Sequence, residues 1–201
     1  MPNLYMIGGA NGSGKTTVAL SLLPELLGVV EYVNADAIAA GLSPLSPESM
    51  AIRAGRLMLE RLQTLADSGA DFAFETTLAA RTFVLFLSDC KAKGYSINLI
   101  YFWLQSPELA VERVARRVAS GGHSIPEEVI RRRYEQGRKN LNELYLQLCD
   151  SWIIYDNSEP RCKLVAEGGR GQGEPMIYEP ESWVQVERGI NGGTATTIEQ
   201  N

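Results

Sequence analysis

Eight residues near the N-terminus have the types and spacing of a phosphate-binding loop. The pattern is glycine, four further residues, glycine, lysine and then serine or threonine, and here it reads Gly9-Ala10-Asn11-Gly12-Ser13-Gly14-Lys15-Thr16. Glycines let the backbone curl until successive N–H groups point at phosphate oxygens. Lysine reaches the β- and γ-phosphates, the Thr16 hydroxyl suits Mg²⁺, and Thr17 follows for the α-phosphate. The loop therefore predicts a site for a nucleoside triphosphate, taken as ATP, with Mg²⁺.

The segments on either side of the loop support this interpretation. Leu4 to Gly8 is a short apolar run that predicts a buried strand, and residues 15–23 predict a helix that Pro24 ends. The competing interpretation is a chance glycine-rich turn, but a strand before the loop and a helix after it argue against that. The spacing of a dinucleotide-binding fingerprint is absent from the sequence.

A carboxylate follows the second predicted strand, which covers Val29 to Asn34. Ligands of doubly wound sheets bind beyond the carboxyl ends of the strands, so Asp36 is expected to face the same crevice as the phosphate loop. There it can accept the proton of an attacking hydroxyl, as phosphoryl transfer requires. The competing interpretation is a helix cap for residues 37–40, and the residues favour neither.

The third predicted strand, residues 71–75, also ends on polar side chains. Glu75 can order a magnesium-bound water or hold substrate hydroxyls, and Thr76 comes next to it. Capping the following helix is the competing role, for which Thr77 serves equally well. We expect Glu75 and Thr76 to contact the molecule that accepts the phosphoryl group.

Six arginines flank a flexible Gly121-Gly122 break between two predicted helices. The first helix reaches about residue 119, and the second runs from Ser124 and Pro126 to about residue 148. Arginine-rich helices joined by a glycine hinge are typical of lids that close over phosphates and supply charge to the transition state. The six residues are Arg113, Arg116, Arg117, Arg131, Arg132 and Arg133.

Helical phase selects two of these arginines. Arg117 lies at the edge of the apolar stripe of the first helix and Arg133 borders that of the second, whereas Arg116 and Arg132 point away. We therefore expect Arg117 and Arg133 to face inward. The stripe predicted for the first helix consists of Ala110, Val111, Val114, Ala115 and Val118.

The other charged residues of this region have simpler interpretations. Solvated helix faces with ion pairs, Glu112 with Arg116 and Glu128 with Arg132, account for most of the arginines. For His123, in the hinge loop, a helix cap or a solvent contact is preferred over a catalytic role.

Strands alternate with helices five times along the chain. Further strands are predicted over residues 97–104 and 152–155, and further helices over residues 81–93 and after Ser46. The helix after Ser46 has apolar positions at Ile52, Leu57, Leu59, Leu62 and Leu65. This order predicts an α/β fold with a doubly wound, mainly parallel five-stranded sheet of the P-loop NTPase type, a helical lid and a short C-terminal extension.

We expect one domain over residues 1–162, with residues 163–201 as an extension packed on it. Glu167 to Gly173 is glycine-rich and predicts a mobile loop. Met176 to Val186 predicts either a hairpin strand or a short helix with Trp183 packed down. The polar residues 189–201 are expected to be frayed.

Composition excludes several other classes of protein. With 19 basic and 24 acidic residues the net charge is −5, which argues against a general nucleic-acid binder. Three scattered cysteines and one histidine predict neither a disulfide framework nor a structural zinc site. The sequence has no basic leader, no signal-length apolar run and no membrane-spanning stretch. These features predict a reduced cytoplasmic protein that does not bind membranes.

Taken in order, the motifs from Leu4 to Ser158 resemble the zeta-toxin-like P-loop kinases, in particular their small stand-alone members. The loop alone is unspecific, but the ordered set is far more specific. The matching stretches are Gly-Ala-Asn-Gly-Ser-Gly-Lys-Thr-Thr at 9–17, Asn-Ala-Asp at 34–36, Phe-Glu-Thr-Thr-Leu at 74–78, Gly-Gly-His-Ser-Ile-Pro at 121–126, Arg-Arg-Tyr at 132–134 and Tyr-Asp-Asn-Ser at 155–158.

The resemblance implies a reaction and roles for several residues. Zeta toxins transfer a phosphoryl group from ATP, with magnesium, to a hydroxyl of UDP-N-acetylglucosamine, so a small-molecule hydroxyl acceptor is implied. By similarity Asp36 is the base and Lys15 clamps the phosphates. Arg117 and Arg133 would stabilise the transferring group, and Glu75 would lie in the substrate cleft.

Two further expectations come from the same resemblance. The segment 156–158 would lie near the nucleotide base, so Asn157 is expected to bind the nucleotide. Toxin members act against an antitoxin that blocks the triphosphate site, which implies an antitoxin as a protein partner.

The main alternative is a P-loop ATPase or nucleotide-dependent regulator without a small-molecule acceptor. Such a protein needs a strand of four apolar residues that ends in acidic residues, which Phe72-Ala73-Phe74-Glu75 matches poorly. A GTPase would carry an Asn-Lys-x-Asp base reader, and the sequence contains none.

Overall fold

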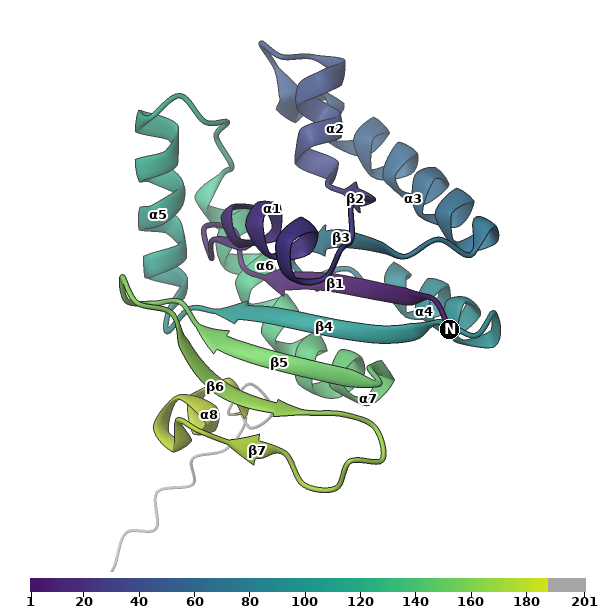
Figure 1. The fold of residues 1–201 in the computed structure, drawn as a ribbon. Coiled ribbons are helices and arrows are strands. Elements are labelled where there is room, and N and C mark those ends of the chain that lie inside the picture. Colours follow the sequence, from purple (N-terminus) through teal and green to yellow (C-terminus); the bar gives the residue numbers. More distant parts are fainter. Residues whose placement is uncertain (188–201) are drawn as a thin grey trace, which may run out of the picture.

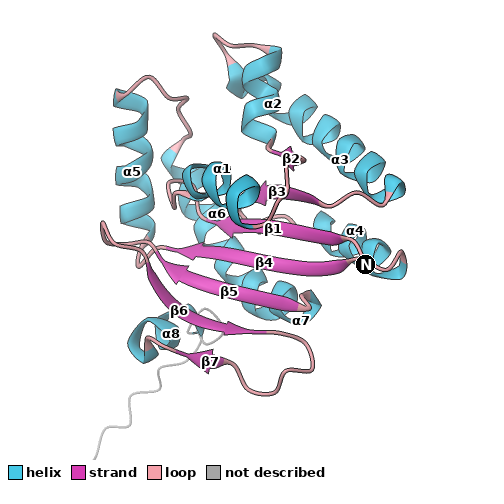
Figure 2. Ribbon diagram, in the orientation of Figure 1, coloured by secondary structure: helices cyan, strands magenta, loops and turns pink. Residues whose placement is uncertain are grey.

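The computed structural model describes residues 1–187, which form a seven-stranded sheet with helices packed on both faces (Figures 1 and 2). The strands are β1 (Asn3–Gly9), β2 (Tyr32–Val33), β3 (Phe72–Thr76), β4 (Ser96–Trp103), β5 (Ser151–Asp156), β6 (Lys163–Gly168) and β7 (Met176–Ile177). The helices are α1 (Lys15–Leu26), α2 (Ala35–Leu42), the 3-10 helix η1 (Pro47–Met50), α3 (Ala51–Ser68), α4 (Thr82–Ala92), α5 (Pro107–Ala119), α6 (Glu127–Asn140), the π-helical turn η2 (Leu141–Tyr145), α7 (Leu146–Leu148) and α8 (Pro180–Glu187).

The strand order is β2-β3-β1-β4-β5-β6-β7, and all pairs from β2 to β5 are parallel. Alternate residues of the central strand β1 point to opposite faces of the sheet. Leu4 and Met6 pack into the core under α3 and α4, whereas Ile7 packs with Ala19 and Leu23 of α1. The predicted doubly wound, mainly parallel α/β class is therefore confirmed.

The prediction of five strands is wrong, because β6 and β7 continue the sheet in antiparallel orientation. The region predicted as a mobile loop contains the end of β6. Gly168 pairs there with Trp152, whose indole ring lies 2.6 Å from the position that a Cβ on Gly168 would take. A strand glycine was mistaken for a loop glycine because the ring that covers it comes from another strand.

Three helix predictions also need correction. Pro24 does not end α1, which continues to Leu26. In α3, Ile52 and Leu59, two of the apolar positions named for the predicted amphipathic helix, are 77% and 39% exposed, while Ala54 and Met58 are buried. The apolar stripe therefore exists, but its centre is rotated about the helix axis. In α5, the predicted stripe residues Ala115 and Val118 are likewise exposed.

The segment Met176–Val186 forms both of the elements predicted as alternatives, β7 followed by α8. Trp183 of α8 is buried and stacks on Trp152 of β5, with ring centroids 5.8 Å apart. The expectation for residues 189–201 lies outside the described residues. No helix within residues 1–187 has the length and apolar character that crossing a membrane would require.

Candidate active site

The predicted phosphate-binding loop joins the carboxyl end of β1 to the first residue of α1. Gly9, Gly12 and Gly14 have φ values of 144°, 80° and 86°, which residues with side chains rarely adopt. Space is also tight, since a Cβ on Gly9 would lie 2.4 Å from the carbonyl oxygen of Phe102. No side chain of residues 1–187 caps α1, so the N–H groups of its first turn remain available to an anion.

Lys15 is the buried cation of this loop, with 5% of its surface exposed. Its Nζ donates a hydrogen bond to the carbonyl oxygen of Ala10 at 2.7 Å and lies 3.7 Å from Oε1 of Glu75. Burial lowers the pKa of Lys15 because it disfavours the charged form, and the carboxylates of Glu75 and Asp36 oppose this shift. The two carboxylates thus favour the ammonium form, which is the form that binds phosphate.

Glu75, near the end of β3, connects the loop to β2. Its Oε2 accepts hydrogen bonds from Thr16 Oγ1 at 2.6 Å, from Tyr32 Oη at 2.6 Å and from Asn34 Nδ2 at 2.9 Å. Burial and the Glu75 carboxylate raise the pKa of Tyr32, so its hydroxyl stays protonated and donates. Tyr32 and Asn34 were not among the predicted site residues, although Asn34 belongs to the Asn-Ala-Asp motif at 34–36.

Glu75→Gln is expected to reduce the free energy of unfolding by about 1–3 kcal/mol, the usual cost of leaving buried hydrogen-bond partners unsatisfied. A neutral amide also removes the negative charge beside Lys15. Urea denaturation followed by tryptophan fluorescence measures the change. The control is Glu60→Gln at an exposed position of α3, expected to change stability by less than about 0.5 kcal/mol. Equal losses in the two variants would show that Glu75 does not hold the loop to β2.

The structure excludes one of the two interpretations left open for Asp36. Asn34, not Asp36, is the N-cap of α2, because its Oδ1 accepts from the backbone N–H of Asp36 at 2.8 Å and of Ala37 at 3.1 Å. The capping role considered for Asp36 is therefore wrong, and α2 begins at Ala35. The half-exposed carboxylate of Asp36 instead lies on the wall of a cavity.

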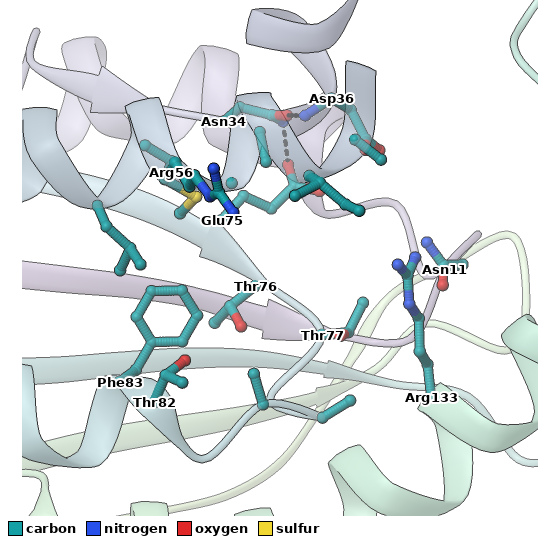
Figure 3. A pocket seen from close by; sticks show the side chains of 18 of the residues that line it. Asn11, Asn34, Asp36, Arg56, Glu75, Thr76, Thr77, Thr82, Phe83 and Arg133 are labelled. Atoms are coloured by element: carbon teal, nitrogen blue, oxygen red, sulfur yellow. Dashed lines mark hydrogen bonds between the residues drawn. The ribbon is translucent and has the colours of Figure 1, made fainter. Parts of the chain in front are cut away.

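That cavity has a volume of about 430 Å³, enough for a small molecule, and is bounded by α3, the ends of the strands and α6 (Figure 3). Its lining includes Lys15, Asp36, Glu75, Thr76 and Arg133, which come from four different elements. The structure thus brings the predicted phosphate clamp, base, acceptor contacts and one lid arginine to a single space. Arg117, the other lid arginine, does not line it.

Arg117 is connected to Asp36 indirectly, because both residues contact His123. The Nε2 of His123 lies 3.5 Å from Oδ2 of Asp36, and Nη2 of Arg117 donates to the carbonyl oxygen of His123 at 3.2 Å. Arg117 is half-buried and Arg116 exposed, as their helical phase predicted. The preferred interpretation of His123 as a helix cap or solvent contact did not include this approach to Asp36, although a quarter of the side chain is exposed to solvent. Nothing local in the sequence indicates this, because the contact spans two distant segments.

Arg133 lies on the border between two cavities. Besides the first, it lines a second cavity of about 370 Å³ that is bounded by α2, η1 and the α5–α6 loop, and Asp36 also lines both. Its neighbour Arg132 is exposed, as the helical phase predicted. Asp36 of α2 and Arg133 of α6 therefore line the same two cavities.

One of the two predicted ion pairs is present. Glu112 and Arg116 pair at 2.5 Å. The pair of Glu128 with Arg132 is not found among the described residues, so that prediction is wrong. Arg131, the preceding residue, instead bridges to carboxylates in both α5 and its own helix, Glu108 and Glu127. This contact fixes the two helices of the hairpin to each other.

The loop that follows Glu75 and Thr76 is fastened to α6. Nδ2 of Asn140 donates to the carbonyl oxygens of Leu78 at 2.8 Å and Ala79 at 3.1 Å. Gly137 permits the close approach, because a Cβ there would lie 2.2 Å from the carbonyl oxygen of Thr77. Since α6 also carries Arg133, one rigid contact positions both sides of the cavity. Asn140 was not predicted, and its partners lie about sixty residues away.

Asn157, predicted to bind the nucleotide, follows β5 and contacts the phosphate loop. Its Nδ2 donates to the carbonyl oxygen of Ser13 at 2.9 Å. A Cβ on Gly14 would lie 2.6 Å from the same nitrogen. The side chain therefore borders the phosphate loop and is not part of the lining of the 430 Å³ cavity.

The oxygen donors beside the loop fit Mg²⁺. Thr16 Oγ1 and Glu75 Oε2 are 2.6 Å apart, and both are hard oxygen ligands of the type that this ion prefers. Within residues 1–187 no group of three or more His, Cys, Asp and Glu side chains could hold a metal.

Comparison with known proteins gives the family. A family model described as zeta toxin matches residues 1–164. The chain belongs to the zeta toxin family. This family member is also 30% identical, over 126 residues, to an uncharacterized protein of Haemophilus influenzae, and the match covers 63% of this chain and 88% of that protein.

Two solved structures support the fold of this zeta toxin family member. The structure of AvrRxo1-ORF1:-ORF2 with ATP has a TM-score of 0.73 at 16% identity, and the match covers all of this chain and 66% of that one. The structure from the PezAT chromosomal toxin–antitoxin system of Streptococcus pneumoniae has a TM-score of 0.61 at 19% identity, with coverage of 95% and 86%. Family and fold together support a P-loop kinase-like phosphotransferase, as the resemblance implied.

Proposed function

We propose that this zeta toxin family member transfers the γ-phosphoryl group of ATP to a hydroxyl of a small molecule, with sugar nucleotides as the first acceptors to test. One observation carries the proposal. Lys15 of the phosphate loop and the carboxylate of Asp36 line the same cavity, which has room for a second molecule beside the loop. A protein that only hydrolysed ATP would need no such space.

In the proposed reaction, Asp36 takes the proton of the acceptor hydroxyl while its oxygen attacks the γ-phosphorus of ATP. The bond between the γ-phosphorus and the bridging oxygen breaks, and ADP leaves. Lys15 holds the β- and γ-phosphates, and the glycine loop residues bind through their backbone N–H groups. Arg117 and Arg133 balance the charge on the transferring group.

Thr16 and Glu75 are the proposed ligand environment of Mg²⁺, which when bound neutralises charge on the β- and γ-phosphate oxygens. The hydrogen bond from Thr16 to Glu75 favours a role for Glu75 in ordering metal-bound water, next to its proposed contact with the acceptor. Thr76 lines the acceptor cavity beside it, and Asn157 lies beside the phosphate loop for the nucleotide.

The test is transfer of label from γ-labelled ATP, with Mg²⁺, to a panel of sugar nucleotides, sugar phosphates and small alcohols. We expect a labelled product from at least one acceptor, at a rate well above the release of free phosphate. Release of phosphate alone, unchanged by every acceptor, would favour the ATPase alternative and reject the proposal.

An antitoxin partner is the second part of this proposal. It is supported by the PezAT structure, which comes from a toxin–antitoxin system, and by AvrRxo1-ORF1, which was solved together with ORF2. Such a partner would cover the triphosphate site, so its addition to the labelling assay should suppress transfer. A bound partner protein that leaves the transfer rate unchanged would contradict this role.

A further inference from the structure

One wall of the 430 Å³ cavity has chemistry that the proposed transfer does not use. This wall is a face of α3 that carries Ile52, Arg56 and Leu59. The spacing of four and three residues places these side chains on one side of the helix. Because Ile52 and Leu59 are exposed, their apolar surface borders the cavity instead of the core.

Arg56 is exposed, and among residues 1–187 its charge has no partner. Within residues 1–187 its guanidinium makes neither a hydrogen bond nor an ion pair, whereas Arg61 on the same helix pairs with Glu31 at 2.7 Å. Figure 3 shows Arg56 on the α3 side of the cavity and Arg133 on another side, reaching up from α6. A guanidinium at the wall of a cavity is a fork that can bind phosphate or carboxylate through two parallel hydrogen bonds.

The other charges of the cavity are already engaged. Lys15 lies 3.7 Å from Glu75, and Asp36 lies 3.5 Å from His123. Arg133, the remaining cation of the lining, is assigned to the transferring phosphoryl group under the proposed function. Among the described residues that line this cavity, Arg56 is therefore the cation that remains for the acceptor itself.

We propose that Arg56 binds an anionic group of the acceptor, a phosphate or a carboxylate, while the acceptor hydroxyl lies at Asp36. The acceptor class is then a hydroxyl compound that carries its own negative charge, and its apolar part contacts Ile52 and Leu59. This inference rests on the proposed function, because it assumes that the cavity holds the acceptor.

The experiment compares four probes by isothermal titration calorimetry. UDP-N-acetylglucosamine and N-acetylglucosamine 1-phosphate carry phosphate, glucuronate carries a carboxylate, and N-acetylglucosamine is neutral. We expect the wild type to bind at least one anionic probe more tightly than N-acetylglucosamine. Arg56→Gln should lose about 10- to 100-fold in affinity for that probe and leave N-acetylglucosamine unchanged. Arg56→Lys keeps the positive charge but loses the planar guanidinium, so its affinity for that probe should lie between those of the wild type and Arg56→Gln.

Arg53→Gln is the matched control, since Arg53 is exposed on the same helix but does not line the cavity. Its affinities should equal those of the wild type, and the melting temperature of each variant confirms that it is folded. Phosphate is identified as the recognised group if the two phosphorylated probes respond to Arg56→Gln, and carboxylate if glucuronate does.

Three results would overturn the inference: no binding of any anionic probe, equal affinity for N-acetylglucosamine, or an Arg56→Gln affinity within about twofold of wild type. Label transfer from ATP is measured in the same samples. If an anionic probe binds in an Arg56-dependent way but no label is transferred, the proposed kinase function is contradicted while the proposal that Arg56 binds an anion is supported. If label is transferred to a neutral acceptor at the same rate in the wild type and in Arg56→Gln, the kinase function is supported while the proposed role of Arg56 is contradicted.

Discussion

Asp36→Asn is expected to reduce phosphoryl transfer by about 10²- to 10⁴-fold, the usual contribution of a general base. Asparagine is nearly the same size as aspartate, and the N-cap of α2 is supplied by Asn34, so the helix should keep its start. The affinity for ATP should persist, because the phosphate loop and Lys15 are untouched. Transfer rates from the labelling assay, together with calorimetric ATP binding, check both expectations.

The matched control for this variant is Asp89→Asn, at an exposed position of α4 away from the cavity, which should transfer at the wild-type rate. The comparison also separates the classes of protein. A regulator that only hydrolyses ATP should keep its hydrolysis in Asp36→Asn. Unchanged transfer to the acceptor in this variant would remove Asp36 from the mechanism.

Gly9→Ala is expected to destabilise the protein and abolish ATP binding. At a φ of 144° an alanine costs about 1–3 kcal/mol of backbone strain. The added methyl group would also meet the carbonyl oxygen of Phe102 at 2.4 Å and Oγ of Ser13 at 2.5 Å, which costs about 1–3 kcal/mol more. To relieve either contact, the phosphate loop or β4 must shift, and the backbone N–H groups of the loop would then no longer point at the phosphate oxygens. Thermal unfolding and ATP titration measure the two effects.

Gly41→Ala provides the control for glycine replacement. Gly41 lies in α2, and a Cβ there would meet nothing within 4 Å. Alanine is the better helix former by about 0.5–1 kcal/mol, so this variant should melt at or above the wild-type temperature and bind ATP normally. If Gly9→Ala behaved in the same way, the loop could not have the tight conformation described for it.

Much of the site was predictable because it depends on local patterns. The glycine and lysine spacing of residues 9–16 fixes a loop that only such residues can form, and the apolar run before it fixes the strand. The parallel alternation then places Asp36 and Glu75 at the same edge of the sheet, since the carboxyl ends of parallel strands meet there. Helical phase was sufficient to choose Arg117 over Arg116.

Other features could not be predicted because each depends on residues far apart in the chain. Periodicity shows which face of a helix is apolar, but not whether that face meets the core or a cavity, so the exposure of Ile52 and Leu59 could not be predicted. Likewise β6 is a strand because an open edge of β5 and the ring of Trp152 are available to it.

The sequence by itself determined the phosphate loop, the α/β order of elements and the edge of the sheet where the chemistry lies, because steric rules for glycine and the period of apolar residues act within a few residues. Only the tertiary structure decided which partners the polar groups take. Glu75 bonds to Thr16 across 59 positions, and His123 reaches Asp36 from the lid. Those choices depend on which elements pack together, since a hydrogen bond forms only where the fold brings donor and acceptor to a suitable distance and angle.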